Sequence, residues 1–377
     1  MSAMIPVSRP HFGIEEEQAA VAALRSGWVT QGPRVAEFER AFAAALGQPE
    51  AIAVSSCTTG LHLVLHALGI GRGDEVVVPS LSFIATANSV AHTGATPVFA
   101  DIDLATYNLD ASSAAKALSR RTKAILLVHQ VGLPADTAAF RRLARHKRVK
   151  LIEDAACAIG SQVDGKPVGG DAEVAVFSFH PRKLVTTGEG GMIVTRSRAL
   201  ARRLRSLRHH GVSISDFARH ASGKVVVEAY REVGFNYRMT DLQAGVGLVQ
   251  LGRLEELIER RQEQGTRYDR AFAKHPALAI PQVAPNVRFN YQTYLLRLLP
   301  GARLTRDALM QRLLEQGIAT RRGVMAAHRE PAYKKSKLRV PLTATNEADR
   351  TAIVLPLYHA MTAADQDQVI EAVLGLV

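Results

Sequence analysis

The chain has 377 residues, of which 47% are hydrophobic and 22% charged, so it can form a large core and is not expected to be disordered. Its two cysteines, Cys57 and Cys157, form neither a disulfide framework nor a CxxC motif. The segment Met1–Pro10 has no apolar core of signal-peptide length, and no apolar run approaches a membrane span. The net charge of +12 favours anionic partners without specifying them. We expect a cytoplasmic protein without a membrane segment or a metal site.

Basic residues are concentrated in two stretches, Arg141–Lys150 and Arg196–Arg208. In the second stretch Leu200, Leu204 and Leu207 recur at helical spacing, which predicts one buried stripe with the arginines on the solvated face. No helix-turn-helix signature, zinc-ligand spacing or interleaved aromatic residues accompany either stretch. We therefore expect no nucleic-acid partner.

The first two-thirds of the chain alternates short β-rich runs with helical patterns. The predicted strands are Ala51–Ser56, Glu75–Pro79, Thr96–Asp101, Ala124–His129, Lys150–Asp154, Val174–Phe179 and Gly191–Thr195. The predicted helices are Gly60–Leu68, Ile84–His92, Thr137–Lys147 and Ala199–His209. Several strand runs are apolar throughout, as in strands covered on both faces. We therefore predict an α/β fold whose large domain contains a mostly parallel seven-stranded sheet flanked by helices.

A long helical pattern follows, from Thr240 to about His275, and Thr240 or Asp241 is a candidate cap for its start. Its length and its charged second half indicate a helix that links two domains. Beyond it we predict a strand at Tyr294–Leu298 and helices at Arg306–Gln316 and Ala364–Leu374. The prediction is a large domain over residues 1–255 and a smaller C-terminal α/β domain over residues 256–377.

Polar residues gather where the predicted strands end, which is where open α/β sheets bind their ligands. The segment Ser55–Gly60 follows a strand and precedes a helix, so its hydroxyls and free N–H groups can bind an anion, although Ser and Thr are also ordinary helix caps. Asp154 ends an apolar strand. A carboxylate buried there needs a cationic or hydrogen-bonding partner, such as a protonated pyridine nitrogen, unless it merely caps the next loop.

Two further segments carry candidate functional groups. The first, Phe177–Lys183, runs into the glycine-rich Thr186–Gly191, so Lys183 follows a strand end and precedes a tight turn. A lysine in that position can form a Schiff base if its surroundings lower its pKa, although most loop lysines are simply solvated. The second, Gly234–Met239, stands just before the long helix and can also be read as a turn ahead of its cap.

Asp154 and Lys183 are separated by a single predicted strand, which places a carboxylate and an amine on neighbouring strand ends. Pyridoxal phosphate (PLP) needs an acid at its ring nitrogen, a lysine at its aldehyde and a binding site for its phosphate. The order of these segments therefore predicts a PLP site.

Four segments of the chain stand out as ordered blocks: Ser26–Gly32, Pro79–Asn88, Ser178–Lys183 and Thr186–Gly191. Through them the sequence resembles the DegT/DnrJ/StrS group of sugar aminotransferases, within the fold-type I PLP enzymes. The resemblance runs from Ser26 to about Arg261 and more weakly to the C-terminus. So many ordered blocks do not agree by chance.

The resemblance implies roles for individual residues. Lys183 would form the Schiff base and move the proton, Asp154 would pair with the pyridinium, and Phe83 would stack on the ring. Asn236 would reach the phosphate of the other subunit in a homodimer. The phosphate of the same subunit would be bound by Thr58, Thr59 and Ser178. One position departs from the family, because many members have Gln where this chain has Cys157, which is a weak partner for the phenolic oxygen of the cofactor.

The implied reaction is the transfer of an amino group from glutamate or glutamine to a nucleotide-linked keto sugar or a keto-cyclitol. Trp28, His328 and Tyr333 are candidates for the acceptor pocket, although core or loop packing is the more common role for each of these residue types. Dehydration of a sugar by the same fold is an alternative, but dehydrating relatives carry histidine where this chain has Lys183. A regulatory or DNA-binding protein is the alternative outside enzymes, and filter binding with a salt titration would identify it by a steep salt dependence.

Overall fold

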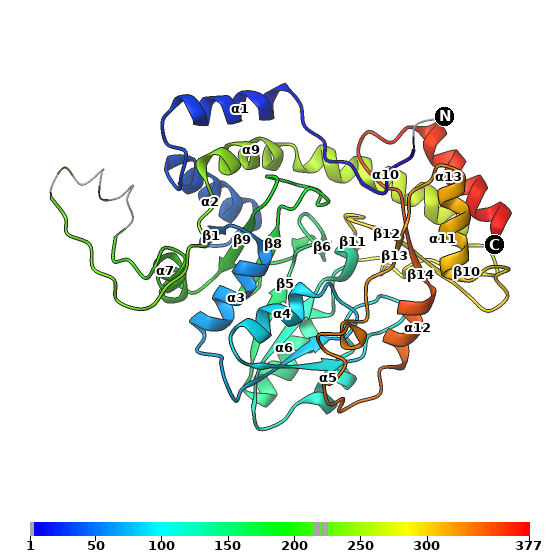
Figure 1. Ribbon diagram of the computed structural model, residues 1–377, viewed down its shortest axis with the longest axis horizontal. Coiled ribbons are helices and arrows are strands. Elements are labelled where there is room, and N and C mark those ends of the chain that lie inside the picture. Colours follow the sequence, from blue (N-terminus) through cyan, green and yellow to red (C-terminus); the bar gives the residue numbers. More distant parts are fainter. Residues whose placement is uncertain (1–3, 215–218, 220–222, 224) are drawn as a thin grey trace.

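The computed structural model describes residues 4–214, 219, 223 and 225–377 (Figure 1). A seven-stranded sheet forms its centre, in the order β1-β9-β8-β5-β4-β2-β3. Neighbouring strands pair in parallel except at β9, which runs antiparallel to both β1 and β8. The strands are β1 (Glu50–Val54), β2 (Glu75–Pro79), β3 (Thr96–Ala100), β4 (Thr122–Val128), β5 (Lys150–Asp154), β8 (Val174–Ser178) and β9 (Gly191–Thr195). This confirms the predicted mostly parallel sheet of an α/β fold.

Helices cover both faces of this sheet (Figure 1). One face packs against α3 (Cys57–Ala67), α4 (Ala85–His92), α5 (Ala111–Ala117), α6 (Thr137–Lys147) and α7 (Arg198–Leu207). The other face packs against α2 (Pro33–Leu46), α9 (Asp241–Gly252) and α10 (Leu254–Phe272). In β1, Ile52 and Val54 belong to the first apolar cluster and Ala51 and Ala53 to the second, because successive side chains of a strand point to opposite faces. The continuous apolar runs of the sequence follow from this two-sided burial.

The boundary between β1 and α3 differs from the prediction. The predicted strand Ala51–Ser56 ends at Val54, because Ser56 already serves as the N-cap of α3. Helix α3 accordingly begins before the predicted start at Gly60. The two threonines after Cys57 thus lie in its first turn, which is the part of a helix that attracts anions.

The predicted helix from Thr240 to His275 is two helices, α9 and α10, separated at Arg253. Thr240 caps α9 in a reciprocal arrangement with Gln243, as the sequence suggested. The backbone at Arg253 leaves the helical region, with φ −97° and ψ 7°, and follows Gly252, a weak helix former. The remaining predicted elements agree with the structure to within two residues at each end.

A second, antiparallel sheet has the order β10-β12-β14-β13. Its strands are β10 (Leu278–Ala279), β12 (Tyr294–Leu298), β14 (Ala352–Leu355) and β13 (Arg321–Arg322), with α11 (Arg306–Glu315), α13 (Ala363–Leu376) and α12 (Thr343–Thr351) around it. The N-terminal segment joins this region, because Ile5 forms a bridge with Ile318 and packs in the same apolar cluster. The chain then returns to the large sheet through α1 (Ile14–Arg25), which lies along α9 (Figure 1).

Three short strands form a small sheet between these regions: β6 (Gln162–Val163), β7 (Lys166–Pro167) and β11 (Val287–Arg288). Single 3-10 turns lie at Gln130–Gly132 and Ala327–Arg329. Within the part of the chain that is described, no helix is both long and apolar enough to cross a membrane.

Candidate active site

The predicted lysine and carboxylate come from neighbouring strands at one edge of the large sheet. Asp154 is the last residue of β5, and Lys183 lies in the turn that follows β8, where its N–H donates to the His180 carbonyl at 2.8 Å. Since β5 and β8 pair in parallel, their carboxyl ends meet at the same edge. The Lys183 amine donates to the Cys157 sulfur at 3.0 Å, so the residue that replaces the family's Gln directly contacts the lysine.

Asp154 is buried, with 4% of its surface exposed. Its carboxylate accepts hydrogen bonds from the Thr86 hydroxyl at 3.0 Å and from the Ala156 N–H at 3.1 Å. Burial has the largest influence on the pKa of Asp154 and raises it, and the two hydrogen bonds and the charge of Lys183 only partly offset that effect. A cation bound against Asp154 would relieve this cost, and the protonated nitrogen of a pyridine ring is such a cation.

Lys183 is subject to opposing influences. Burial alone would lower its pKa, but the Cys157 sulfur, together with Cys57 and Asp154, raises it above the usual value. This upward direction differs from the lowered pKa that Schiff-base formation requires. A cation next to Asp154 would counteract the attraction of that carboxylate and so lower the pKa of the lysine.

The start of α3 lies beside β9 because glycine occupies position 191. A Cβ atom there would lie 2.7 Å from the Cys57 backbone nitrogen, so any larger residue would push the first turn of α3 away. Ser56 caps the helix through the Thr59 N–H, and the Thr59 hydroxyl accepts from the Ser56 N–H at 3.0 Å. The Thr59 hydroxyl thus helps to fix the first turn of α3. Thr58 lies in the same turn, at the positively polarised end of the helix.

The other three predicted cofactor residues come from the end of β8 and from the segments before α4 and α9. Ser178 is the half-buried last residue of β8. Phe83 is 60% exposed and directly precedes Ile84, the N-cap of α4. Asn236 is exposed, and its backbone forms a bridge with His209. The exposed side chains of Phe83 and Asn236 are free to contact a bound group. The roles of Phe83, Ser178 and Asn236 in cofactor binding stay predictions.

Two of the three predicted acceptor residues, His328 and Tyr333, pack against the same ring, that of Phe99. The Tyr333 hydroxyl donates to the Asn88 side chain at 2.7 Å and its ring packs edge-on against Phe99. His328 pairs with the buried Ser80 hydroxyl at 2.5 Å. These contacts favour packing roles for both residues. Trp28 is half-buried. The binding of an acceptor by Trp28, His328 and Tyr333 stays a prediction.

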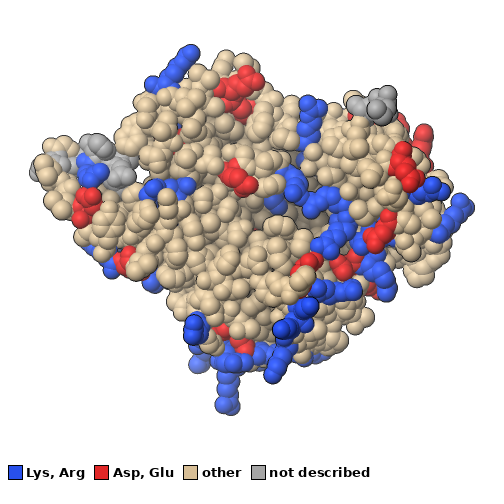
Figure 2. Space-filling model, viewed as in Figure 1, with Lys and Arg blue, Asp and Glu red and all other residues tan. Residues whose placement is uncertain are grey.

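A hollow of about 480 Å³ opens next to the lysine turn and was not found by sequence reasoning. It is lined by Val7, Ser8, Pro10, His180, Pro181, Arg182 and Arg321. On the face drawn in Figure 2, Lys and Arg side chains gather around a depression to the right of centre. Arg321 and the N-terminal residues are remote from Lys183 in the sequence. Their position next to the lysine turn depends on how the second sheet packs against the first, which the sequence pattern does not show.

A buried carboxylate and a lysine on neighbouring parallel strands, beside a helix N-terminus, define the class of fold-type I PLP enzymes, and the charge and hydrogen-bonding groups present fit that cofactor. The chain belongs to the DegT/DnrJ/EryC1/StrS aminotransferase family, which matches residues 10–374. It is thus a PLP-dependent aminotransferase, as the sequence predicted.

Solved structures of three relatives extend this likeness. The aminotransferase TlmJ from Streptoalloteichus hindustanus is 36% identical, with a TM-score of 0.90 over 98% of both chains. Spr1654 from Streptococcus pneumoniae, solved in its PMP form, is 28% identical, with a TM-score of 0.92 over 99% of this chain and 98% of that one. Helicobacter pylori PseC, an aminotransferase involved in the biosynthesis of pseudoaminic acid, is 27% identical, with a TM-score of 0.91 over 99% of both.

Proposed function

We propose that the enzyme transfers an amino group from glutamate or glutamine to a nucleotide-linked keto sugar or a keto-cyclitol, with Lys183 as the lysine that binds the cofactor. The observation that carries this proposal is the position of the Lys183 amine, close to Cys157 and to the electrostatic influence of Asp154 at the carboxyl edge of the sheet. Bound PLP supplies an electron-withdrawing ring that stabilises negative charge on the carbon being deprotonated.

The chain's own residues would bind, orient and exchange protons around that ring. Lys183 takes and returns the proton at the reacting carbons, because it is the amine at the centre of the site. Asp154 keeps the ring nitrogen protonated, and Phe83 covers one face of the ring. The cofactor phosphate would be bound by Thr58 and Thr59 at the start of α3 and by Ser178 at the end of β8.

The acceptor class is supported by the charge beside the lysine turn. Arg182 and Arg321 line the hollow there, and guanidinium groups match the oxygens of a diphosphate. The net charge of +12 would also steer a diphosphate-bearing ligand toward the enzyme. PseC, which takes part in pseudoaminic acid biosynthesis, is a relative compatible with a sugar acceptor.

A homodimer in the cytoplasm is part of the same proposal. Asn236 is exposed in the single chain, and the segment that leads to it also exposes apolar side chains, Val225 by 98%, Val227 by 87% and Val233 by 88%. Isolated apolar residues are common on surfaces, but several in one segment favour coverage by a second copy. The division into residues 1–255 and 256–377 remains a proposal, with its boundary in the first turn of α10.

The experiment converts the enzyme to its pyridoxamine form with glutamate and then adds candidate acceptors. A nucleotide-linked keto sugar or a keto-cyclitol should restore the absorbance of the pyridoxal form rapidly, and simple aliphatic 2-oxo acids should do so slowly, apart from the donor's own product. Efficient restoration by aliphatic 2-oxo acids, with failure of every keto sugar tried, would instead identify an amino-acid aminotransferase.

A further inference from the structure

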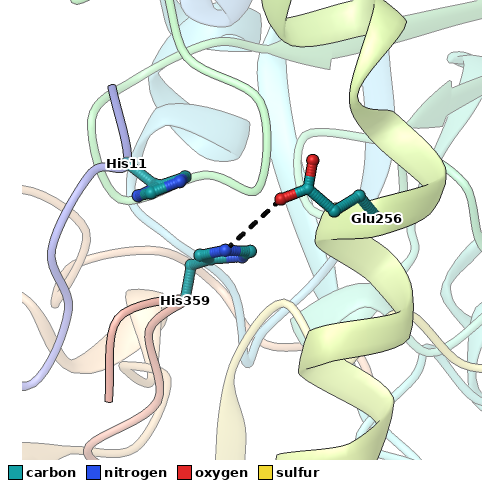
Figure 3. A group of neighbouring side chains, drawn as sticks. All are labelled: His11, Glu256 and His359. Carbon is teal, nitrogen blue, oxygen red and sulfur yellow. Dashed lines mark ion pairs between the residues drawn. The ribbon is translucent and has the colours of Figure 1, made fainter. Parts of the chain in front are cut away.

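Three potential metal ligands from distant parts of the sequence meet outside the lysine site. His11 belongs to the N-terminal segment, Glu256 to the first turn of α10, and His359 to the connection between β14 and α13 (Figure 3). One ligand atom from each lies within 4.8 Å of the other two. The His359 Nε2 atom is 3.5 Å from a Glu256 carboxylate oxygen, and the two imidazole rings stack with their centres 4.1 Å apart.

We propose that His11, Glu256 and His359 bind one divalent transition-metal ion of the zinc type. Imidazole nitrogens and a carboxylate oxygen form a ligand set that suits Zn²⁺, and three protein ligands leave a position for water. Metal–ligand bonds of about 2.0–2.2 Å require the ligand atoms to converge further than they do in the chain alone. The 3.5 Å separation of His359 Nε2 and Glu256 needs little change. The His11 ring, which stacks on His359 in the chain alone, must turn so that both rings direct a nitrogen at the same ion.

Two arginines approach the cluster, and each has a second anchor. Arg253 donates to both oxygens of Glu256 at 3.2 Å and also lies 3.3 Å from a Glu16 oxygen. Arg260 donates to the His359 carbonyl at 3.4 Å and pairs with Glu263 at 3.0 Å. A metal ion can therefore bind Glu256 while Arg253 remains paired with Glu16. Both arginines then still have a carboxylate partner.

The location of the cluster indicates that a bound ion would have a structural role. His11 directly follows Pro10, which lines the hollow next to the lysine turn. An ion held by His11, α10 and the segment after β14 would fix the N-terminal wall of that hollow. Metal binding should therefore stabilise the fold and hold this segment in place, without taking part in amino transfer.

The test uses the PLP-loaded protein without an affinity tag, after treatment with a chelator. Equilibrium dialysis should find one Zn²⁺ per chain, Co²⁺ should give visible ligand-field absorption, and Zn²⁺ should raise Tm. His11→Ala, His359→Ala and Glu256→Gln should each weaken Zn²⁺ binding by about tenfold or more and remove the rise in Tm. Their circular dichroism and cofactor absorbance should match wild type, which shows that each variant is folded.

Matched controls remove the same chemical groups elsewhere. His146→Ala, at the exposed end of α6, and Glu263→Gln, on an exposed turn of α10, should bind Zn²⁺ like wild type. The proposal is overturned if wild type binds no Zn²⁺ at about 100 µM. It is also overturned if the binding survives all three cluster substitutions or is lost in Cys157→Ser instead, which would assign the ion to the active-site thiol.

Discussion

Asp154 combines deep burial with a negative charge, and this conflict makes it suited to a cationic ligand. Its hydrogen bonds to Thr86 and Ala156 orient the carboxylate but do not restore its usual pKa. A carboxyl group whose pKa is raised in the folded chain opposes folding when ionised, and it stops doing so once protonated at lower pH.

The first prediction follows from the raised pKa of Asp154, which makes its ionised carboxylate destabilising. Without cofactor, Asp154→Asn should be at least as stable as wild type near neutral pH, and the difference should shrink as the pH falls through the raised pKa of Asp154 toward the ordinary carboxyl range. With cofactor, the variant should lose activity by about a hundredfold or more, because the ring nitrogen is no longer held protonated. Thermal unfolding between about pH 4 and 8 checks the first part. Near-normal turnover would contradict the second.

Cys157 stands where many members of the family have Gln. Gln in its place would donate a hydrogen bond to the phenolic oxygen of the cofactor, which a thiol does weakly. Cys157→Gln should therefore favour the ionised phenol and lower the pH midpoint of the cofactor's visible absorbance change. A spectrophotometric pH titration measures that midpoint. Cys157→Ala, which offers no donor, should not lower it, and an equal shift in both variants would refute the explanation.

At the scale of elements, apolar runs predicted the sheet well because burial on both faces leaves an unbroken pattern. The ends of the strands were predicted less accurately. Strand β1 stops before Ser56, because Ser56 caps α3 through hydrogen bonds, which the hydrophobic pattern does not show. The break at Arg253 was missed because the apolar pattern continues through it while the backbone does not. The short strands β10 and β13 have two residues each, too few to show a period.

The candidate site was predictable to a similar extent. Asp154 and Lys183 could be paired because parallel strands bring consecutive strand ends together. The walls of the hollow could not, because Pro10 and Arg321 reach it through contacts between the two sheet regions. His11, Glu256 and His359 share no ligand spacing in the sequence for the same reason.

The contact between α3 and β9 yields a prediction about an element boundary. Gly191→Ala would place a methyl group 2.7 Å from the backbone of Cys57, and a helix turn cannot yield as a side chain can. We expect a loss of about 1–3 kcal/mol in the free energy of unfolding and weaker PLP binding. Gly375→Ala in α13 has open space around it and serves as the control, with unchanged or slightly higher stability. Denaturant unfolding and PLP titration distinguish the two, and wild-type cofactor affinity in Gly191→Ala would contradict the account.

For the whole molecule, the proposed exchange of Asn236 between subunits makes the active site depend on assembly. Lys183→Ala and Asn236→Asp are each expected to be inactive, since the second puts a negative charge beside a phosphate. Mixing the two should recover part of the activity in hybrid dimers, in which one site carries neither substitution. Activity assays on the mixture, with analytical ultracentrifugation of wild type, test this. A fully active monomer would contradict the shared site.

The identity of the lysine that bonds to PLP tests the account most directly. Borohydride reduction of the holoenzyme fixes the cofactor on the amine that carries it, and mass spectrometry of the digested protein locates the modified peptide. We predict a single modified residue, Lys183, next to Cys157 and at the edge where β5 delivers Asp154. Modification of any other lysine, with Lys183 unmodified, would contradict the assignment of the active site.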